Sequence, residues 1–225
     1  MYFDTPDLTA LVWFIAAWGG YALYVEFIPH KRSGLNATMN DYREVWMRRM
    51  LAREQRMVDM QVMAALQNGT AFFASTSLLA IGGALTLLRS TDEVLNVVAT
   101  MPVGMATTRI LWEIKAIGIA VIFVYGFFKF AWSYRLYNYV AILLGAMPPV
   151  AEKDTPEAEA HVKRTTGLFT AAGRHFNHGQ RAFFFALGYL GWFVSPYVFM
   201  ASTAAVVFVM WWRQFRSDAR RAMDA

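Results

Sequence analysis

The chain has 225 residues, of which 57% are hydrophobic and only 16% are charged, and it carries a net charge of +5. Soluble globular domains usually carry about a quarter charged residues, so this composition excludes an ordinary soluble domain and predicts an integral membrane protein. The absence of cysteine excludes disulfides, iron–sulfur clusters and a cysteine nucleophile. We attribute the positive charge to orientation in the membrane and expect no nucleic-acid partner.

Four apolar stretches predict about four transmembrane helices, at about residues 8–28, 64–88, 112–134 and 182–212. Each approaches the roughly 20 residues that cross about 30 Å of hydrocarbon. Each must be helical, because lipid offers no partner to unpaired backbone groups. We therefore expect one all-α domain over residues 1–225, a polytopic bundle with the lipid bilayer as its solvent.

The loop at 30–63 carries an apolar stripe that predicts an amphipathic helix at about 40–63. Its large residues recur at spacings of three and four, which places them on one helical face. Neither Pro nor Gly separates this stripe from the second span, so we expect one continuous helix. The candidates for docking a partner on this face are Trp46, Met50, Met57 and Met60.

The second span is unusually polar for a transmembrane helix. Small residues four apart on one helical face allow two helices to pack closely. Hydroxyls near the middle of the bilayer can instead line a path for an ion or small polar solute. Both interpretations stay open. The residues concerned are Gln67, Asn68, Ser75, Thr76, Ser77, Gly82 and Gly83.

Charged residues in or beside the spans form a second group of candidates: Glu26, Glu113, Lys129 and Arg135. A charge at the bilayer centre costs at least about 2.5 kcal/mol, so such residues usually face protein or water. For Lys129 we consider three roles. It reaches the head groups, it pairs with Glu26 at the end of the first span, or it attracts anions along a pathway.

The loop at 147–181 predicts a second amphipathic helix at about 155–180. Thr155 suits its N-cap and Pro156 its first position. Phe169 and Phe176 are seven residues apart, on a face that a partner can contact. His175 and His178 are three apart and can present two imidazoles to a metal, but no carboxylate accompanies them. We expect them to be solvated, and we expect no metal and no cofactor.

Basic residues gather in the loops at 30–63 and 147–181, which predicts that both are cytoplasmic, with the N-terminus outside an inner (plasma) membrane. The basic tail, with Arg213, Arg216, Arg220 and Arg221, conflicts with four spans, which would leave it outside. A hairpin at Pro196 would resolve the conflict, but its arms would have only about 15 residues each. We expect a single span at 182–212 and leave the side of the tail open.

Three runs resemble a known family: M-Q-V-M-A-A-L-Q-N-G-T-A-F-F-A-S-T-S from Met60, H-F-N-H-G-Q-R-A-F-F-F-A-L-G-Y-L-G-W from His175, and W-R-Q-F-R-S from Trp212. They are similar to domain-of-unknown-function family 599 of bacterial and plant membrane proteins. The resemblance implies about four spans and no particular substrate, cofactor or catalytic residue. The matching polar and aromatic positions include Phe73, Ser75, Thr76, Asn177 and Arg181.

From these observations we expect a non-enzymatic homo-oligomer, channel- or transporter-like, that passes an ion or small solute. Ser75, Thr76 and Ser77 would line the path, and Lys129 would bias its charge selectivity. The alternative is an accessory or scaffold subunit that binds another membrane protein through the Trp46 and Phe169 stripes. The sequence contains no motif for a nucleophile–base pair or a cofactor cradle.

Overall fold

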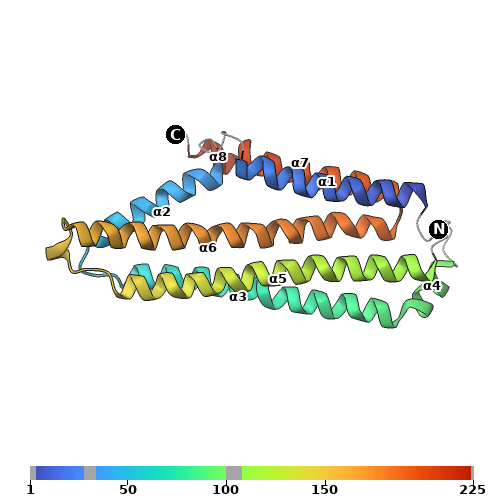
Figure 1. Cartoon of the computed structure of the whole chain (residues 1–225), viewed down its shortest axis with the longest axis horizontal. Coiled ribbons are helices and arrows are strands. Elements are labelled where there is room, and N and C mark those ends of the chain that lie inside the picture. Colours follow the sequence, from blue (N-terminus) through green and yellow to red (C-terminus); the bar gives the residue numbers. More distant parts are fainter. Residues whose placement is uncertain (1–3, 28–33, 100–107, 224–225) are drawn as a thin grey trace.

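The computed structural model is a bundle of long helices that run back and forth along one axis (Figure 1). It describes residues 4–27, 34–99 and 108–223, and every element in these ranges is helical. Ile28, the predicted end of the first span, and the start of the loop at 30–63 lie outside the described residues. The α-helices are α1 (Thr5–Phe27), α2 (Leu35–Leu51), α3 (Met57–Arg89), α4 (Thr91–Ala99), α5 (Arg109–Gly145), α6 (Pro156–Tyr189), α7 (Pro196–Phe215) and α8 (Asp218–Arg221), with 3-10 turns η2 (Val150–Glu152) and η3 (Leu190–Phe193).

Four of these helices are long and apolar enough to cross a membrane: Thr5–Glu26, Met57–Arg89, Arg109–Gly145 and the stretch from Pro196 to Arg221. This confirms the predicted helical membrane bundle. Large apolar side chains face outward along them, such as Ile15 (62% exposed), Leu79 (77%) and Phe128 (65%). Lipid is the solvent in which such a surface is stable, because water would penalise a continuous apolar face of this extent.

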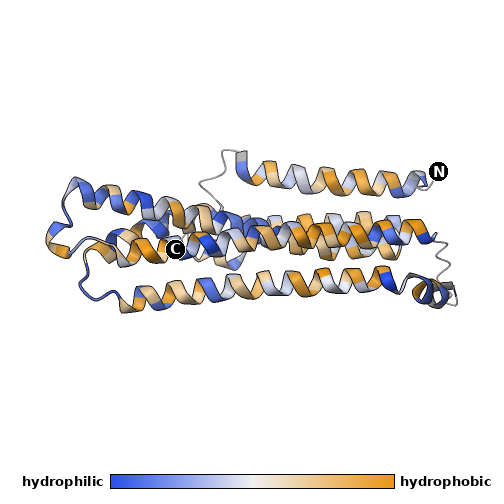
Figure 2. Ribbon diagram, turned by 60° about the horizontal axis from the view of Figure 1, so that its bottom comes forward, coloured by the Kyte–Doolittle hydropathy of each residue, from blue (hydrophilic) through white to orange (hydrophobic). Residues whose placement is uncertain are grey.

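The helices differ in length, and this divides the bundle along its axis. α3, α5 and α6 have 33, 37 and 34 residues, so each is roughly 50 Å long. α1 and α7, with 23 and 20 residues, match about 30 Å of hydrocarbon. We call the part that α1 and α7 cover the membrane half, and the rest, where α2 packs, the extension. Figure 2 shows more hydrophilic residues around the extension.

The membrane half has an aromatic core between α1, α6 and α7. Phe14 of α1 lies 5.7 Å from Phe185 and 5.1 Å from Phe199, measured between ring centroids. At the far end the indole Nε1 of Trp192 donates a 2.6 Å hydrogen bond to Oδ1 of Asp7, and both residues are buried. The start of α1 is therefore fastened to the turn that follows α6.

The extension has a separate core, in which α2 packs against α6. Met47, Met50 and Val162 are fully buried there, and the ring of Trp46 lies 5.3 Å from that of Phe169. The prediction of one continuous helix from 40 into the second span is wrong, since α2 ends at Leu51 and α3 starts at Met57. The chain turns back there because α2 buries its apolar face on α6 rather than continuing along the axis (Figure 1).

Side-chain hydrogen bonds fasten this turn to the end of α5 and to α2. The guanidinium of Arg56 donates to the carbonyls of Met147 and Pro148, at 2.9 and 2.7 Å, just beyond the end of α5. Trp46 Nε1 donates to Oδ1 of the buried Asp59 at 2.6 Å. These bonds join α2, α3 and α5 at one end. They stabilise a break between helices that has neither of the usual helix-ending residues, Gly and Pro.

The prediction of a single span over 182–212 is also wrong. α6 ends at Tyr189, η3 follows, and α7 starts at Pro196 and runs back beside α6. Ser195 caps α7 by accepting a hydrogen bond from the Val198 N–H at 3.1 Å. The hairpin alternative is therefore the correct one, and its first arm is not short, because α6 starts as far back as Pro156. The helix α8 in the tail lies near the start of α2, away from the start of α1 (Figure 1).

Candidate functional site

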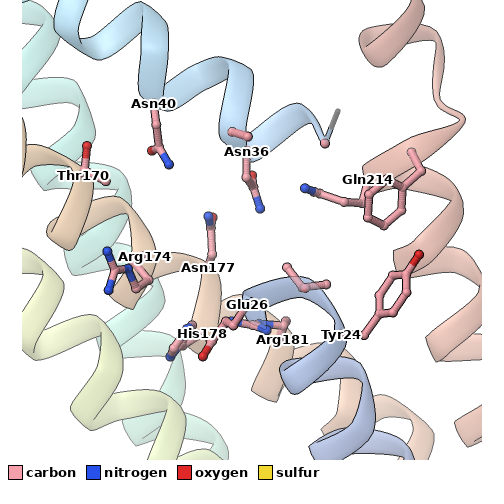
Figure 3. Close-up of a pocket in the computed structure, with 14 residues that line it drawn as sticks. Tyr24, Glu26, Asn36, Asn40, Thr170, Arg174, Asn177, His178, Arg181 and Gln214 are labelled. Carbon is pink, nitrogen blue, oxygen red and sulfur yellow. Dashed lines mark hydrogen bonds and ion pairs between the residues drawn. The ribbon is translucent and has the colours of Figure 1, made fainter. Parts of the chain in front are cut away.

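A pocket of about 250 Å³ lies where the membrane half meets the extension. The end of α1, the start of α2, the middle of α6 and the end of α7 surround it (Figure 3). We call it the polar pocket, because most of the side chains that line it carry hydrogen-bonding groups. They include Tyr24, Asn36, Asn40, Arg174, Asn177 and Gln214. Asn36 and Asn177 point toward one another across it.

A cluster of three ionisable residues forms one wall of the polar pocket. Nη2 of Arg181 and Nε2 of His178 lie 3.2 Å and 2.6 Å from the same oxygen, Oε1 of Glu26. The Arg181 side chain is only 11% exposed. Its Nη1 is buried and finds no hydrogen-bond partner among the described residues. Arg181 therefore neutralises Glu26 and still has donor capacity to spare.

The balance of charge in the polar pocket favours an anion. Arg174 and Arg181 place two guanidinium groups against the single carboxylate of Glu26. Arginine matches carboxylate and phosphate oxygens with paired N–H donors. The amide groups of Asn36, Asn177 and other residues add neutral donors around the same space. The pocket can therefore hold a small anionic group by charge and by hydrogen bonds.

Helix geometry explains why α6 supplies so much of this site. Arg174, His178 and Arg181 follow at spacings of four and three, so they share one face of α6. On another face Gly179 is buried, and a Cβ there would lie 2.7 Å from the ring of Phe130. Phe130 packs in turn on Phe73, at 5.3 Å between centroids. Close packing against α5 thus fixes the rotation of α6 and aims its polar face at the pocket.

The polar residues of α3 do not join this site. Ser75 is exposed, Thr76 Oγ1 donates to the Phe72 carbonyl at 2.8 Å, and the buried Ser77 donates to the Phe73 carbonyl at 2.8 Å. Within the described part of the chain, a Cβ at Gly82 or Gly83 would meet nothing within 4 Å. Gln67 donates to Asn138 of α5 at 2.7 Å, and Asn68 is exposed. The three hydroxyls therefore point in different directions, and neither glycine forms a seam with another described helix.

Of the charged candidates, Glu26 alone lines the polar pocket. Its partners are Arg181 and His178 rather than Lys129, whose ammonium lies 5.2 Å from the ring centroid of Tyr125 on its own helix. The other two candidates have partners on α5. Glu113 pairs with Arg109 at 2.9 Å, and Arg135 donates to the Tyr139 hydroxyl at 2.7 Å.

His175 and His178 are half-buried rather than solvated. The ring of His175 lies 6.4 Å from that of Trp132 and 6.1 Å from that of His178. In the described ranges no group of three His, Cys, Asp or Glu residues is placed to hold a metal ion. His178 thus belongs to the polar pocket through its contact with Glu26.

Most candidates for docking a partner are occupied within the chain. Trp46 and Phe169 contact each other, and Met50 is fully buried beside them. Phe176 packs on Phe73 and Phe130 of α3 and α5, at 5.6 Å in each case. Met57 and Met60 remain exposed, at 75% and 39%. The two stripes thus serve mainly to join α2, α3, α5 and α6.

Sequence reasoning missed most of the polar pocket, because its residues come from four distant segments. Arg174, Asn36, Asn40 and Gln214 were not candidates. Asn177 and Arg181 entered only through the family resemblance. The recurrence of polar residues on one face of α6 as it enters the membrane half was the available signal, since hydrophilic residues at that depth usually face protein or water.

The chain was compared with protein families, curated proteins and solved structures. Among curated proteins and solved structures, none matches it. The model of one family, described as "Protein of unknown function, DUF599", matches residues 9–219, which is nearly the whole chain. The chain therefore belongs to the DUF599 family, as the three runs of sequence indicated.

Proposed function

We propose that this membrane protein is transporter-like and that its solute carries a small anionic group, which the polar pocket binds. The observation that carries this proposal is the excess of guanidinium over carboxylate at the pocket, where Arg174 is exposed and Arg181 has a spare donor. Ligand sites characteristically combine a concave surface with a few convergent polar groups. The pocket supplies both at the boundary between the membrane half and the extension.

The pocket would open on the cytoplasmic side. The turn between α2 and α3, the loop between α5 and α6, and the basic tail all lie toward the extension, whereas Thr5 lies at the opposite end (Figure 1). Basic loops stay inside during membrane insertion. An anion would therefore meet the polar pocket from the cytoplasm.

A pathway for the solute would require more than one copy of the chain. Ser75, Leu79 and Gly83 share an exposed face of α3 at intervals of four. Small residues on a lipid-facing helix allow close approach of a second helix. We infer that copies meet along this face. Crosslinking through a single cysteine at Ser75 should give a dimer, and Gly83→Leu should reduce its yield.

The test of transport uses proteoliposomes and three labelled anions: phosphate, acetate and glycerol phosphate. We expect uptake of at least one anion above that of empty liposomes. Arg174→Gln should reduce this uptake several-fold, because it removes one of the two guanidinium groups at the pocket. Arg174 is exposed and has no ion pair among the described residues, so we expect the variant to fold. Arg164→Gln is the matched control, since Arg164 is an exposed arginine on the same helix, away from the pocket. Uptake of none of the anions, or equal loss in both variants, would refute the proposal.

A further inference from the structure

We propose that the ligand is an anionic amphiphile, with a phosphate-bearing head in the polar pocket and an alkyl chain in a second pocket beside it. This inference rests on the proposed anion site and adds the class of its ligand. It draws on a second cavity, of about 140 Å³, which shares Val25, Asn36 and Arg181 with the polar pocket. The two cavities are therefore neighbours across the same side chains. We call the second one the deeper pocket.

The deeper pocket lies further into the membrane half on α1, α6 and α7, and the start of α2 completes it with Leu35 and Asn36. On α1 it reaches Tyr21, about one turn before Val25. On α6 it reaches Phe184, beyond Arg181, and on α7 it reaches Met210, one turn before Gln214. Each turn of helix is about 5.4 Å. All three helices thus place the deeper pocket toward the hydrocarbon and the polar pocket toward the extension.

The lining gains large apolar side chains along this direction, and polar residues such as Gln180 and Asn177 line the deeper pocket as well. Tyr21, Leu35, Phe184 and Met210 line the deeper pocket and do not line the polar one. Arg213 also lines it, with its guanidinium 5.1 Å from the ring centroid of Phe184. The guanidinium itself therefore lies against the ring of Phe184, within the deeper pocket. The apolar surfaces of Tyr21, Leu35 and Met210 can take the first part of a chain beside it.

The polar pocket and the deeper pocket are arranged like the head group and the alkyl chain of a lipid in the leaflet on the extension side. Its charged head lies at the interface and its chain points into the hydrocarbon. Two arginines, Arg174 and Arg181, line the polar pocket where the head lies, and Arg213 lines the deeper pocket next to it. A phosphate has acceptor oxygens for several guanidinium groups at once, and basic pockets between transmembrane helices recur as phospholipid head-group sites. A free anion would use the polar pocket and leave the deeper one empty.

The experiment measures affinities on the full chain, held in amphipol and freed of lipid, by microscale thermophoresis. The probes are decyl phosphate, inorganic phosphate and decyl glucoside. We expect decyl phosphate to bind at least about tenfold more tightly than either of the others, because it alone fills both pockets. Arg174→Gln should weaken both phosphate probes.

The Leu35→Trp variant tests the binding of the alkyl chain separately from that of the phosphate head. Leu35 lines the deeper pocket and not the polar pocket. An indole there should therefore reduce the affinity for decyl phosphate to that for inorganic phosphate. Unchanged binding of inorganic phosphate will show that the variant is folded. Leu79→Trp is the control, since Leu79 is 77% exposed on α3.

Each other outcome has a defined meaning. Equal affinities for decyl phosphate and inorganic phosphate overturn the amphiphile and leave the anion site standing. Equal affinities for decyl phosphate and decyl glucoside overturn it as well, because the head charge is then not recognised. An unaffected Leu35→Trp variant overturns the position of the chain. Binding of none of the probes removes both the amphiphile and the anion site.

Discussion

Gly179 offers the sharpest test of how the site is held, and we expect Gly179→Ala to destabilise the protein. Its Cβ would lie 2.7 Å from two ring atoms of Phe130 and 2.9 Å from a third. Phe130 is fully buried and packs on Phe73, Phe176 and Phe183, at 5.3 to 5.6 Å between centroids. Its ring cannot withdraw without displacing the other three. Overpacking of this kind costs about 1–3 kcal/mol.

The matched control is Gly167→Ala on the same helix. Gly167 is exposed, and a Cβ there would meet nothing within 4 Å in the described structure. Both substitutions gain up to about 1 kcal/mol of helix propensity. The gain cancels in the comparison, so Gly179→Ala should be less stable than Gly167→Ala by about 1–3 kcal/mol. Reversible unfolding in mixed micelles, followed by tryptophan fluorescence, measures this difference. Equal stabilisation by both substitutions would refute the packing that orients α6.

Two further predictions concern the extension and the tail. Trp46→Phe removes the donor to the buried Asp59, so it should cost about 1–3 kcal/mol in the same unfolding assay, while Met57→Ala, at a 75% exposed position, should stay within about 0.5 kcal/mol. Because the chain has no cysteine, single cysteines at Lys153 and Met223 can be labelled in sealed vesicles with an impermeant maleimide. Both should react from the same side of the membrane, and reaction from opposite sides would contradict the hairpin of α6 and α7.

The apolar stretches and one helix start were predictable because they depend on local chemistry. The length of hydrocarbon to be crossed sets the length of an apolar run, and the structure has four helices that meet it. Thr155 caps α6 as its position before Pro156 predicts, by accepting a hydrogen bond from the Ala158 N–H at 3.2 Å. α5 extends beyond the predicted third span at both ends, from Arg109 to Gly145.

The break between α2 and α3 could not be read from local sequence, whereas Pro196 marked the break before α7. The turn between Leu51 and Met57 contains neither Gly nor Pro, and the side chain of Arg56 secures it on carbonyls some 90 residues away. The polar pocket was hidden for the same reason. Its ionic cluster pairs Glu26 with Arg181, which is 155 residues distant. Such partners are set by the packing of helices, which hydropathy and periodicity do not encode.

The sequence alone did not decide on which side of the membrane the tail lies, because α6 was not recognised as a separate helix. α6 runs through the membrane half between α5 and α7, yet it is not among the four helices that qualify by hydropathy. A helix enclosed by others can keep polar residues such as Asn177 and Arg181, because they face protein and a pocket rather than lipid. Hydropathy therefore finds the helices that lipid surrounds and misses the one at the centre. A crossing by α6 would add one pass to the four, and the basic tail would then lie on the same side as the two basic loops, as the positive-inside rule requires.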